Sequence, residues 1–243
     1  SRHGVSCHIL QGDIMRTFLT AVLIPLLATF PNRASAAKPL PKEVVSQVEA
    51  VIQETLKEKH IPGLTVAIAT ANRLRYEGAF GLADVEHQVP TKTTTRFRTA
   101  SIAKPMTSTL ILRLMEEGKL NLDEHVQTYC ENFPEKKWPV TTRQLLGHLG
   151  GVRHYKVAGE ATDTRHFFNL KSALSVFKDD PLTHEPGTKF QYTSFGYNLL
   201  GSVAEGAGDS TFMTLLGEHV LTPCSMKHTR TDDHLAVIPD RAR

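Results

Sequence analysis

The sequence has very little cysteine, with three residues in a chain of 243. Cys7 precedes a leader-like segment, so Cys130 and Cys224 are the two that an exported chain could pair. Two cysteines so far apart in the sequence make no disulfide framework of the kind that staples small secreted domains. We therefore expect two free, buried thiols.

The sequence also lacks an excess of one charge, with 28 basic and 25 acidic residues and a net charge of +3. No basic stripe interleaved with aromatic residues is present, which argues against nucleic acid as a partner. Hydrophobic residues make up 40% of the chain. This length and composition suit one soluble domain, or one domain with an inserted subdomain.

A long hydrophobic run is missing as well. The apolar segment 17–30 follows Met15 and Arg16, but it is too short, and too interrupted by Pro25, for a good membrane span. The small residues that end at Ala36 form a cleavage site typical of secretory signals.

These features predict three segments along the chain. Residues 15–36 are expected to be a signal peptide, which directs the protein to the periplasm or the exterior and leaves no stable membrane span after cleavage. Residues 1–14 fit no targeting pattern and are interpreted as a non-native or upstream segment. The remaining residues, 37–243, are expected to form the folded domain.

Hydrophobic periodicity predicts the main elements of that domain. Apolar residues at helical spacing indicate a helix over 41–61, and alternation indicates a hairpin over 64–81. A second helix is expected from Ser101 to Glu117. Short helical patterns broken by turns predict a helical, loop-rich subdomain over about 121–180, and a turn, an extended piece and a helix are expected over 186–208.

Motifs for metal ions and for one hydrolase class are absent. The histidines match neither H-x-H-x-D-H nor H-E-x-x-H, so we expect no metal and no cofactor and interpret them as surface or hydrogen-bonded residues. A zinc hydrolase is therefore disfavoured. No G-x-S-x-G elbow is present, which argues against an α/β-hydrolase.

Ser-x-x-Lys occurs three times, beginning at Ser35, Ser101 and Ser175. The first straddles the predicted cleavage site, and the third lies within a predicted surface helix. Ser101 alone stands where a helix begins after a loop. Spacing of three places Lys104 on the same helix face, and the helix N-terminus can stabilise negative charge on oxygen. From spacing alone, a helix cap at Ser101 with an exposed Lys104 remains the favoured interpretation.

Tyr192 and Ser194 form a second candidate pair, in the sequence QYTSFGYNLLG. A phenol close to a cationic lysine can ionise and act as a general base. In an extended strand, Ser194 would point to the same side as Tyr192. Taken alone, a packing tyrosine in a hydrophobic turn is the favoured interpretation.

In their order along the chain, IPGLTVAIAT, RTASIAKPMTS, HLGGV and QYTSFGYNLLG resemble the serine β-lactamase and penicillin-binding superfamily. The class C branch is the most similar, with the mitochondrial β-lactamase-like serine hydrolases and their bacterial relatives. The resemblance covers roughly residues 60–243. It implies an α/β (α+β) fold of the β-lactamase/transpeptidase type, in which helices flank an antiparallel sheet beside a helical subdomain.

The resemblance also implies roles for the four candidates. Ser101 would be the acylated nucleophile, with its backbone N–H as an oxyanion donor, and Lys104 would help to deprotonate it. Tyr192 would be the shared general base. Ser194 would contact the acyl side of the substrate, where class C enzymes usually carry Asn. The loop HLGGV is interpreted as structural.

One expected feature of the family is not found in the sequence. A Lys/His-Thr/Ser-Gly box on an inner strand is missing, and His228-Thr229-Arg230 comes too early and has Arg in place of Gly. We therefore interpret the chain as C-terminally truncated, with an incomplete sheet.

The resemblance leaves two functions open. The first is hydrolysis, through an acyl-enzyme, of a β-lactam, a peptidoglycan-like D-Ala-D-Ala peptide or a small ester. The alternative is a non-catalytic binding or assembly module, or an inactive relic.

Overall fold

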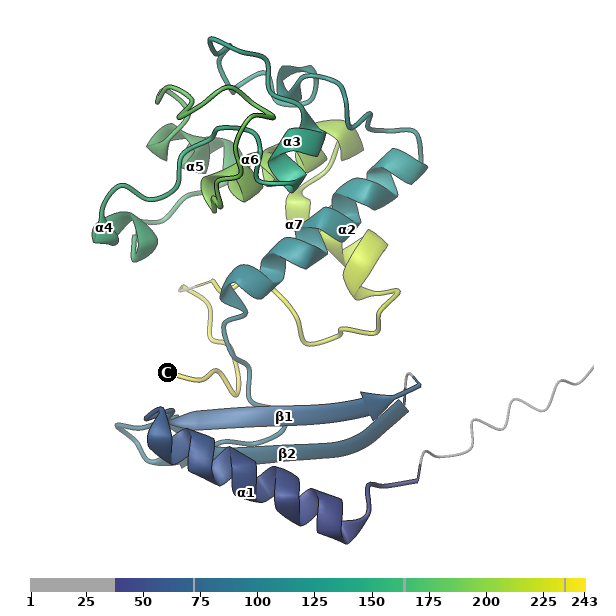
Figure 1. Ribbon diagram of the computed structural model, residues 1–243, viewed down its shortest axis with the longest axis vertical. Coiled ribbons are helices and arrows are strands. Elements are labelled where there is room, and N and C mark those ends of the chain that lie inside the picture. Colours follow the sequence, from purple (N-terminus) through teal and green to yellow (C-terminus); the bar gives the residue numbers. More distant parts are fainter. Residues whose placement is uncertain (1–37, 72, 164, 234) are drawn as a thin grey trace, which may run out of the picture. The chain divides into compact units, whose positions relative to one another are not determined.

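The computed structural model describes residues 38–71, 73–163, 165–233 and 235–243. The predicted upstream segment and signal peptide, residues 1–14 and 15–36, lie outside this range. Residues from Leu40 onward belong to one structural unit, and Figure 1 labels its elements.

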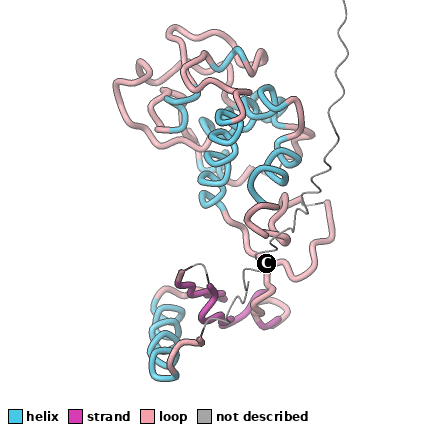
Figure 2. The backbone as a smooth tube through the Cα atoms, turned by 90° about the vertical axis from the view of Figure 1, so that its right-hand side faces the viewer, coloured by secondary structure: helices cyan, strands magenta, loops and turns pink. Residues whose placement is uncertain are grey.

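The first part of this unit is a helix beside an antiparallel hairpin. Helix α1 spans Lys42–Glu58, and it is followed by β1 (Gly63–Thr70) and β2 (Arg73–Asp84). The short strand β3 (Val89–Pro90) completes a partial sheet of order β1-β2-β3. The predicted helix and hairpin are confirmed, and Figure 2 shows the strands in magenta beside the cyan helix.

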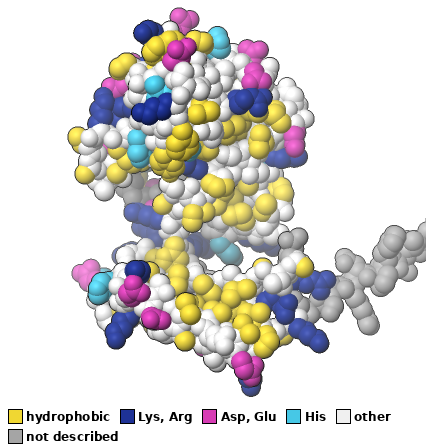
Figure 3. Space-filling view, viewed as in Figure 1, with side chains coloured by type: hydrophobic (Ala, Val, Ile, Leu, Met, Phe, Trp, Pro, Cys, Tyr) yellow, Lys and Arg dark blue, Asp and Glu magenta, His cyan; other side chains and the backbone are white. Residues whose placement is uncertain are grey.

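Helix α1 packs on β2. The Tyr76 hydroxyl of β2 donates a hydrogen bond of 3.1 Å to Glu49 Oε1 of α1. Hydrophobic side chains also remain on the surface over α1 and the hairpin (Figure 3), among them Val51, which is 61% exposed, and Leu74, which is 53% exposed.

Helix α2 begins after a tight turn. Ala100–Ile102 form the 3₁₀ turn η1, and α2 continues as an α-helix over Ala103–Glu116. Gly118 adopts a φ of +71°, which ends the helix in the left-handed conformation that suits glycine. The predicted helix from Ser101 to Glu117 is therefore confirmed, with a tighter first turn.

Short helices and loops follow α2. Two of the helices begin with a capping box: Thr141 caps α3 with Gln144, and Asn169 caps α5 with Ser172. In Figure 2 loops make up most of this part of the chain. The elements are η2 (Val126–Thr128), α3 (Thr142–Leu146), α4 (Ala158–Ala161), α5 (Leu170–Ala173) and η3 (Leu174–Val176).

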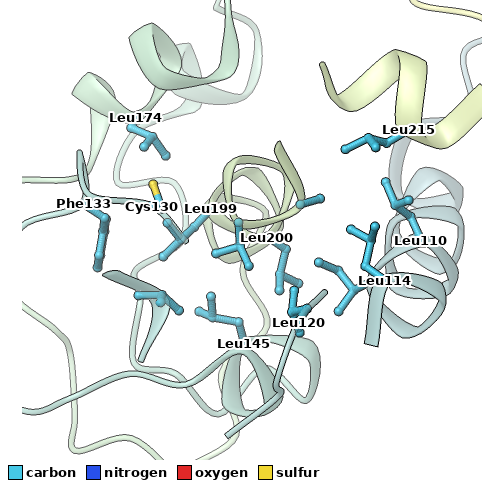
Figure 4. Packing of buried hydrophobic residues seen from close by; sticks show 14 of the residues in the cluster. Leu110, Leu114, Leu120, Cys130, Phe133, Leu145, Leu174, Leu199, Leu200 and Leu215 are labelled. Atoms are coloured by element: carbon cyan, nitrogen blue, oxygen red, sulfur yellow. The ribbon is translucent and has the colours of Figure 1, made fainter. Parts of the chain in front are cut away.

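The hydrophobic core forms around α6 (Phe195–Gly208), which packs against α2, α3 and α7 (Phe212–Leu216). The π-helical turn η4 (Gly217–Leu221) follows α7. A Cβ atom at Gly206 would collide with the carbonyl group of Tyr129, so this close approach requires glycine. Figure 4 shows leucine side chains from α2, α6 and α7 meeting in the core, including Leu110, Leu114, Leu199, Leu200 and Leu215.

Both cysteines in the described part of the chain are free thiols. Cys130 is buried in the core, as expected, and burial raises the pKa of its thiol. The expectation that Cys224 is buried is wrong. It lies in the exposed turn after η4, where residues 222–225 all face solvent.

None of the helices in the described ranges combines the length and the apolar character needed to cross a membrane.

Leu200→Ala is expected to lower the free energy of unfolding by about 3 kcal/mol, because a fully buried leucine leaves a cavity that its neighbours fill only in part. Leu112→Ala is the matched control, since Leu112 is 42% exposed on α2 and should cost about 0.5 kcal/mol or less. Urea denaturation of both variants measures the difference. Equal losses would contradict the assignment of Leu200 to the core.

Candidate active site

Four side chains meet where the start of α2 faces the start of α6. The Tyr192 hydroxyl donates a hydrogen bond of 2.7 Å to Ser101 Oγ. Lys104 Nζ donates to the same oxygen at 3.1 Å and to Ser194 Oγ at 3.4 Å. The structure thus brings together all four residues that the sequence singled out: Tyr192 and Lys104 bond to Ser101 Oγ, and Ser194 joins them through Lys104.

The backbone before Ser101 is strained. Ala100 has a φ of +44°, in the left-handed region that non-glycine residues seldom adopt. The turn η1 then carries Ser101 to the first turn of a helical segment, with its side chain exposed to solvent. Strain of this kind persists where the surrounding structure holds a side chain in a required position.

Lys104 lies one turn along from Ser101 and is half-buried. Its Nζ is 4.8 Å from the centre of the Tyr192 ring and 5.7 Å from that of Tyr197. Both distances lie within the range of cation–π contacts. The interpretation of Ser101 as a helix cap with an exposed lysine is therefore replaced by a shared network.

The segment that carries Tyr192 is fixed by its neighbour Thr193, which is buried. Thr193 Oγ1 donates to the carbonyl oxygen of Arg153 at 2.6 Å and accepts the Gly196 N–H at 3.2 Å. The assumption of an extended strand through Ser194 is wrong. Ser194 is the N-cap of α6, with φ −79° and ψ −34°, and its side chain reaches Lys104 because the helix begins there.

The pKa of Tyr192 lies below its ordinary value of 10.0. Interaction of the phenol oxygen with Lys104 is the largest cause, and the hydrogen bond with Ser101 adds to it. Both favour the ionised form, and together they outweigh the smaller effect of burial. Tyr192 can therefore accept a proton from Ser101 at a lower pH than a free tyrosine could.

A cavity of about 680 Å³ begins beside the strained turn. It is lined by residues 93–100 and by residues of the segment 228–241. Across it, Asp232 forms ion pairs with Arg98 and Arg241. His228, Thr229 and Arg230 lie in this lining as part of a loop and not on a strand.

Nothing in the described ranges gathers three or more metal-binding side chains into one cluster. This arrangement offers the chemistry of an activated serine, because a lysine and a phenol both hydrogen-bond to the serine oxygen.

The sequence also matches a family model described as Beta-lactamase, over residues 48–243. The chain belongs to the beta-lactamase family. Protein flp of Staphylococcus aureus strain MW2 is 29% identical over 187 residues, which cover 75% of this chain and 37% of that protein. The human mitochondrial serine beta-lactamase-like protein LACTB is 29% identical over 250 residues, covering 75% of this chain and 46% of its own length.

Solved structures of related proteins share the fold. The hydrolase EstCE1, described as having promiscuous acyltransferase activity, has a TM-score of 0.70 at 25% identity, over 83% of this chain and 56% of its own. The octameric penicillin-binding protein homologue from Pyrococcus abyssi has a TM-score of 0.69 at 26% identity, over 82% and 47% of the two chains. This beta-lactamase family chain spans less than half the length of the curated relatives above.

Two residues of the site were missed by the sequence analysis. His148 Nδ1 accepts the backbone N–H of Thr193, and His154 Nδ1 accepts that of Ser194, both at 3.2 Å. The sequence predicts surface or hydrogen-bonded histidines; both are hydrogen-bonded, but they lie against Tyr192 in the site and are not scattered over the surface. The sequence carries no signal for this role: His148 is the first residue of HLGGV and His154 follows that loop, and both are far from Tyr192 along the chain.

Proposed function

We propose that this beta-lactamase family member is an exported serine hydrolase that works through an acyl-enzyme on Ser101. The observation that carries the proposal is the pair of hydrogen bonds from Tyr192 and Lys104 onto the same exposed Ser101 Oγ. Export rests on the sequence pattern of residues 15–36.

In the proposed acylation, the ionised Tyr192 oxygen takes the proton of the Ser101 hydroxyl as Oγ attacks the carbonyl carbon of the substrate. Lys104 stabilises the negative charge on both oxygens, because it lies within hydrogen-bond range of Ser101 and over the Tyr192 ring. The backbone N–H of Ser101 serves as an oxyanion donor. The bond to the leaving group then breaks, and Tyr192 returns the proton to that group.

Deacylation uses the same groups in reverse. A water molecule gives a proton to the Tyr192 oxygen and adds to the acyl carbon. The bond from that carbon to Ser101 Oγ breaks, and the proton returns to Oγ, which regenerates the free serine and releases the acid. The atoms and charges of both steps balance without a metal ion or a redox partner.

Ser194 is proposed to orient the acyl side of the substrate. Its oxygen accepts a hydrogen bond from Lys104, so its own hydroxyl proton is left to donate to a substrate carbonyl. Ile102 and Phe190 expose apolar side chains beside the site, at 69% and 65%. We propose a small ester, a β-lactam or a D-Ala-D-Ala-like peptide as substrate, in keeping with the similar structures of a hydrolase with promiscuous acyltransferase activity and of a penicillin-binding protein homologue.

The test is a covalent adduct. The chain is incubated with a fluorescent penicillin and, separately, with p-nitrophenyl acetate, and intact mass followed by peptide mapping locates the acyl group. The expected result is one acyl group on Ser101 and a burst of p-nitrophenol. Binding of the penicillin without any adduct, and no burst, would instead support the alternative of a binding or assembly module.

A further inference from the structure

Two histidines hold consecutive backbone amides of the segment that carries Tyr192. The amides are those of Thr193 and Ser194, and each donates to a histidine Nδ1 at 3.2 Å. A backbone N–H can only donate, so Nδ1 of His148 and of His154 must be unprotonated. Each ring is therefore neutral, with its single proton on Nε2.

The same two rings also pack against the phenol. The ring centre of His148 lies 4.6 Å from that of Tyr192 at an angle of 37°, and His154 meets it edge-on at 5.5 Å and 88°. The hydrogen bonds fix the backbone on one side of Tyr192, and the rings fix its side chain. Together they determine where the hydroxyl group meets Ser101.

Each histidine is in turn held in place by other groups. His148 has a φ of +57°, a left-handed conformation, and its carbonyl oxygen accepts the Gln191 N–H at 2.8 Å. Its ring lies 5.1 Å from that of Tyr197, whose hydroxyl donates to the carbonyl oxygen of Leu146 at 3.1 Å. A glycine would relieve the backbone strain at position 148; the histidine there keeps its strained conformation while its ring contacts Tyr192 and Tyr197.

His154 is anchored through the buried Arg153. The guanidinium group donates to the His154 carbonyl oxygen at 3.0 Å and is paired with Glu160 and Asp180. Since Arg153 is only 7% exposed and both carboxylates bond to it, this network keeps the loop rigid.

The charges around the two rings favour their neutral form. The titratable groups that face them are Lys104 of α2, Tyr197 of α6, Tyr192, Tyr155 and each other. Burial is the first cause that lowers the pKa of both histidines below 6.5, and the Lys104 ammonium is the second. At neutral pH both rings can therefore accept their hydrogen bonds.

We propose that His148 and His154 are positioning residues whose neutral rings hold Tyr192 against Ser101, and whose protonation releases the segment and stops acylation in acid. The inference rests on the proposed function of Ser101. A protonated Nδ1 carries its own hydrogen, which would point at the hydrogen of the backbone amide. Such a nitrogen can no longer accept the hydrogen bond from that amide. The positive ring would also be repelled by Lys104.

The decisive variants separate the effect of the histidine hydrogen bond from the effect of ring packing against Tyr192. His154→Phe keeps an aromatic ring beside Tyr192 but has no acceptor, and it is expected to lower the acylation rate by about 10²-fold at pH 7.5, because small displacements of a catalytic group are costly. His154→Asn restores an acceptor near the Nδ1 position and should recover most of that rate. His148→Asn tolerates the left-handed backbone and retains an acceptor in the same way.

The pH profile distinguishes positioning from simple structural support. In the wild-type chain, acylation should fall steeply as the pH drops below the lowered histidine pKa values. Because asparagine does not titrate, the double Asn variant should lose that steep fall and keep only the gradual decline that comes from protonation of Tyr192. His60→Asn is the matched control, since His60 is exposed, has a φ of +53° and lies in the loop after α1. It should leave rate and profile unchanged.

Stopped-flow labelling with the fluorescent penicillin and the p-nitrophenyl acetate burst give the rates, and thermal melting checks that each variant folds. Histidine ¹⁵N NMR reports the tautomers independently of activity, and it should show Nδ1 unprotonated in both residues at pH 7.5. An Nδ1–H tautomer, or wild-type rates in His154→Phe, overturns the inference. A wild-type chain with the expected tautomers but no acylation overturns the proposed function, and with it the kinetic role of the histidines.

Discussion

Ser101→Ala is expected to abolish the covalent adduct with a fluorescent penicillin and to lower p-nitrophenyl acetate hydrolysis by about 10³-fold or more. The reason is that Ser101 Oγ is the atom on which the hydrogen bonds of Tyr192 and Lys104 converge. Alanine removes that oxygen while it preserves the 3₁₀ turn. The measurement is intact-mass labelling together with the initial rate of p-nitrophenol release.

Ser175→Ala is the matched control for this variant, because Ser175 has the same spacing to Lys178 as Ser101 has to Lys104. Ser175 Oγ donates instead to the carbonyl oxygen of Ser172, at 2.7 Å. This variant should label and hydrolyse like the wild-type chain. An adduct that survives in Ser101→Ala would place the nucleophile elsewhere.

Tyr192→Phe is expected to slow acylation by about 10² to 10⁴-fold, the usual contribution of a general base. Phenylalanine keeps the ring that packs against His148 and His154, so the loss reflects the hydroxyl group. Burst kinetics with p-nitrophenyl acetate measure the change. Tyr155→Phe serves as control, because Tyr155 is exposed to nearly the same extent, 38% against 39%, and also contacts His154.

The pH dependence of the acylation rate tests the same role of Tyr192. The proposed base is the ionised form of Tyr192, and Lys104 lowers the pKa of Tyr192 below 10.0. The wild-type rate should therefore rise with pH with an apparent pKa below 10.0, whereas Tyr192→Phe should show no such rise. If Tyr192→Phe kept both the rate and the alkaline rise, Tyr192 would not be the base.

Much of the architecture was predictable because it depends on local patterns. The spacing of apolar residues located α1, and alternation located the hairpin of β1 and β2. The same reasoning placed Ser101 at a helix start and Lys104 one turn along. It was less accurate for Cys224 and for the backbone at Ser194, because exposure and helix starts depend on what packs against a segment.

The assembly of the site was not accessible to local patterns. Tyr192 and Ser101 are 91 residues apart and share a hydrogen bond, so the sequence could connect them only through resemblance to a known family. Neither histidine could be assigned at all, since a histidine hydrogen-bonded to a distant amide has the same sequence signature as one on the surface.

The sequence by itself determined the chemical groups of this protein: a serine and a lysine on one helix face, and a tyrosine and a serine in one short motif. Only the tertiary structure decided how they act together. Packing of α6 against α2 brings the phenol to the serine, and the loop that carries His148 and His154 holds it there. The physical reason is that periodicity specifies which face of an element is buried, while contacts between distant segments specify which polar atoms meet.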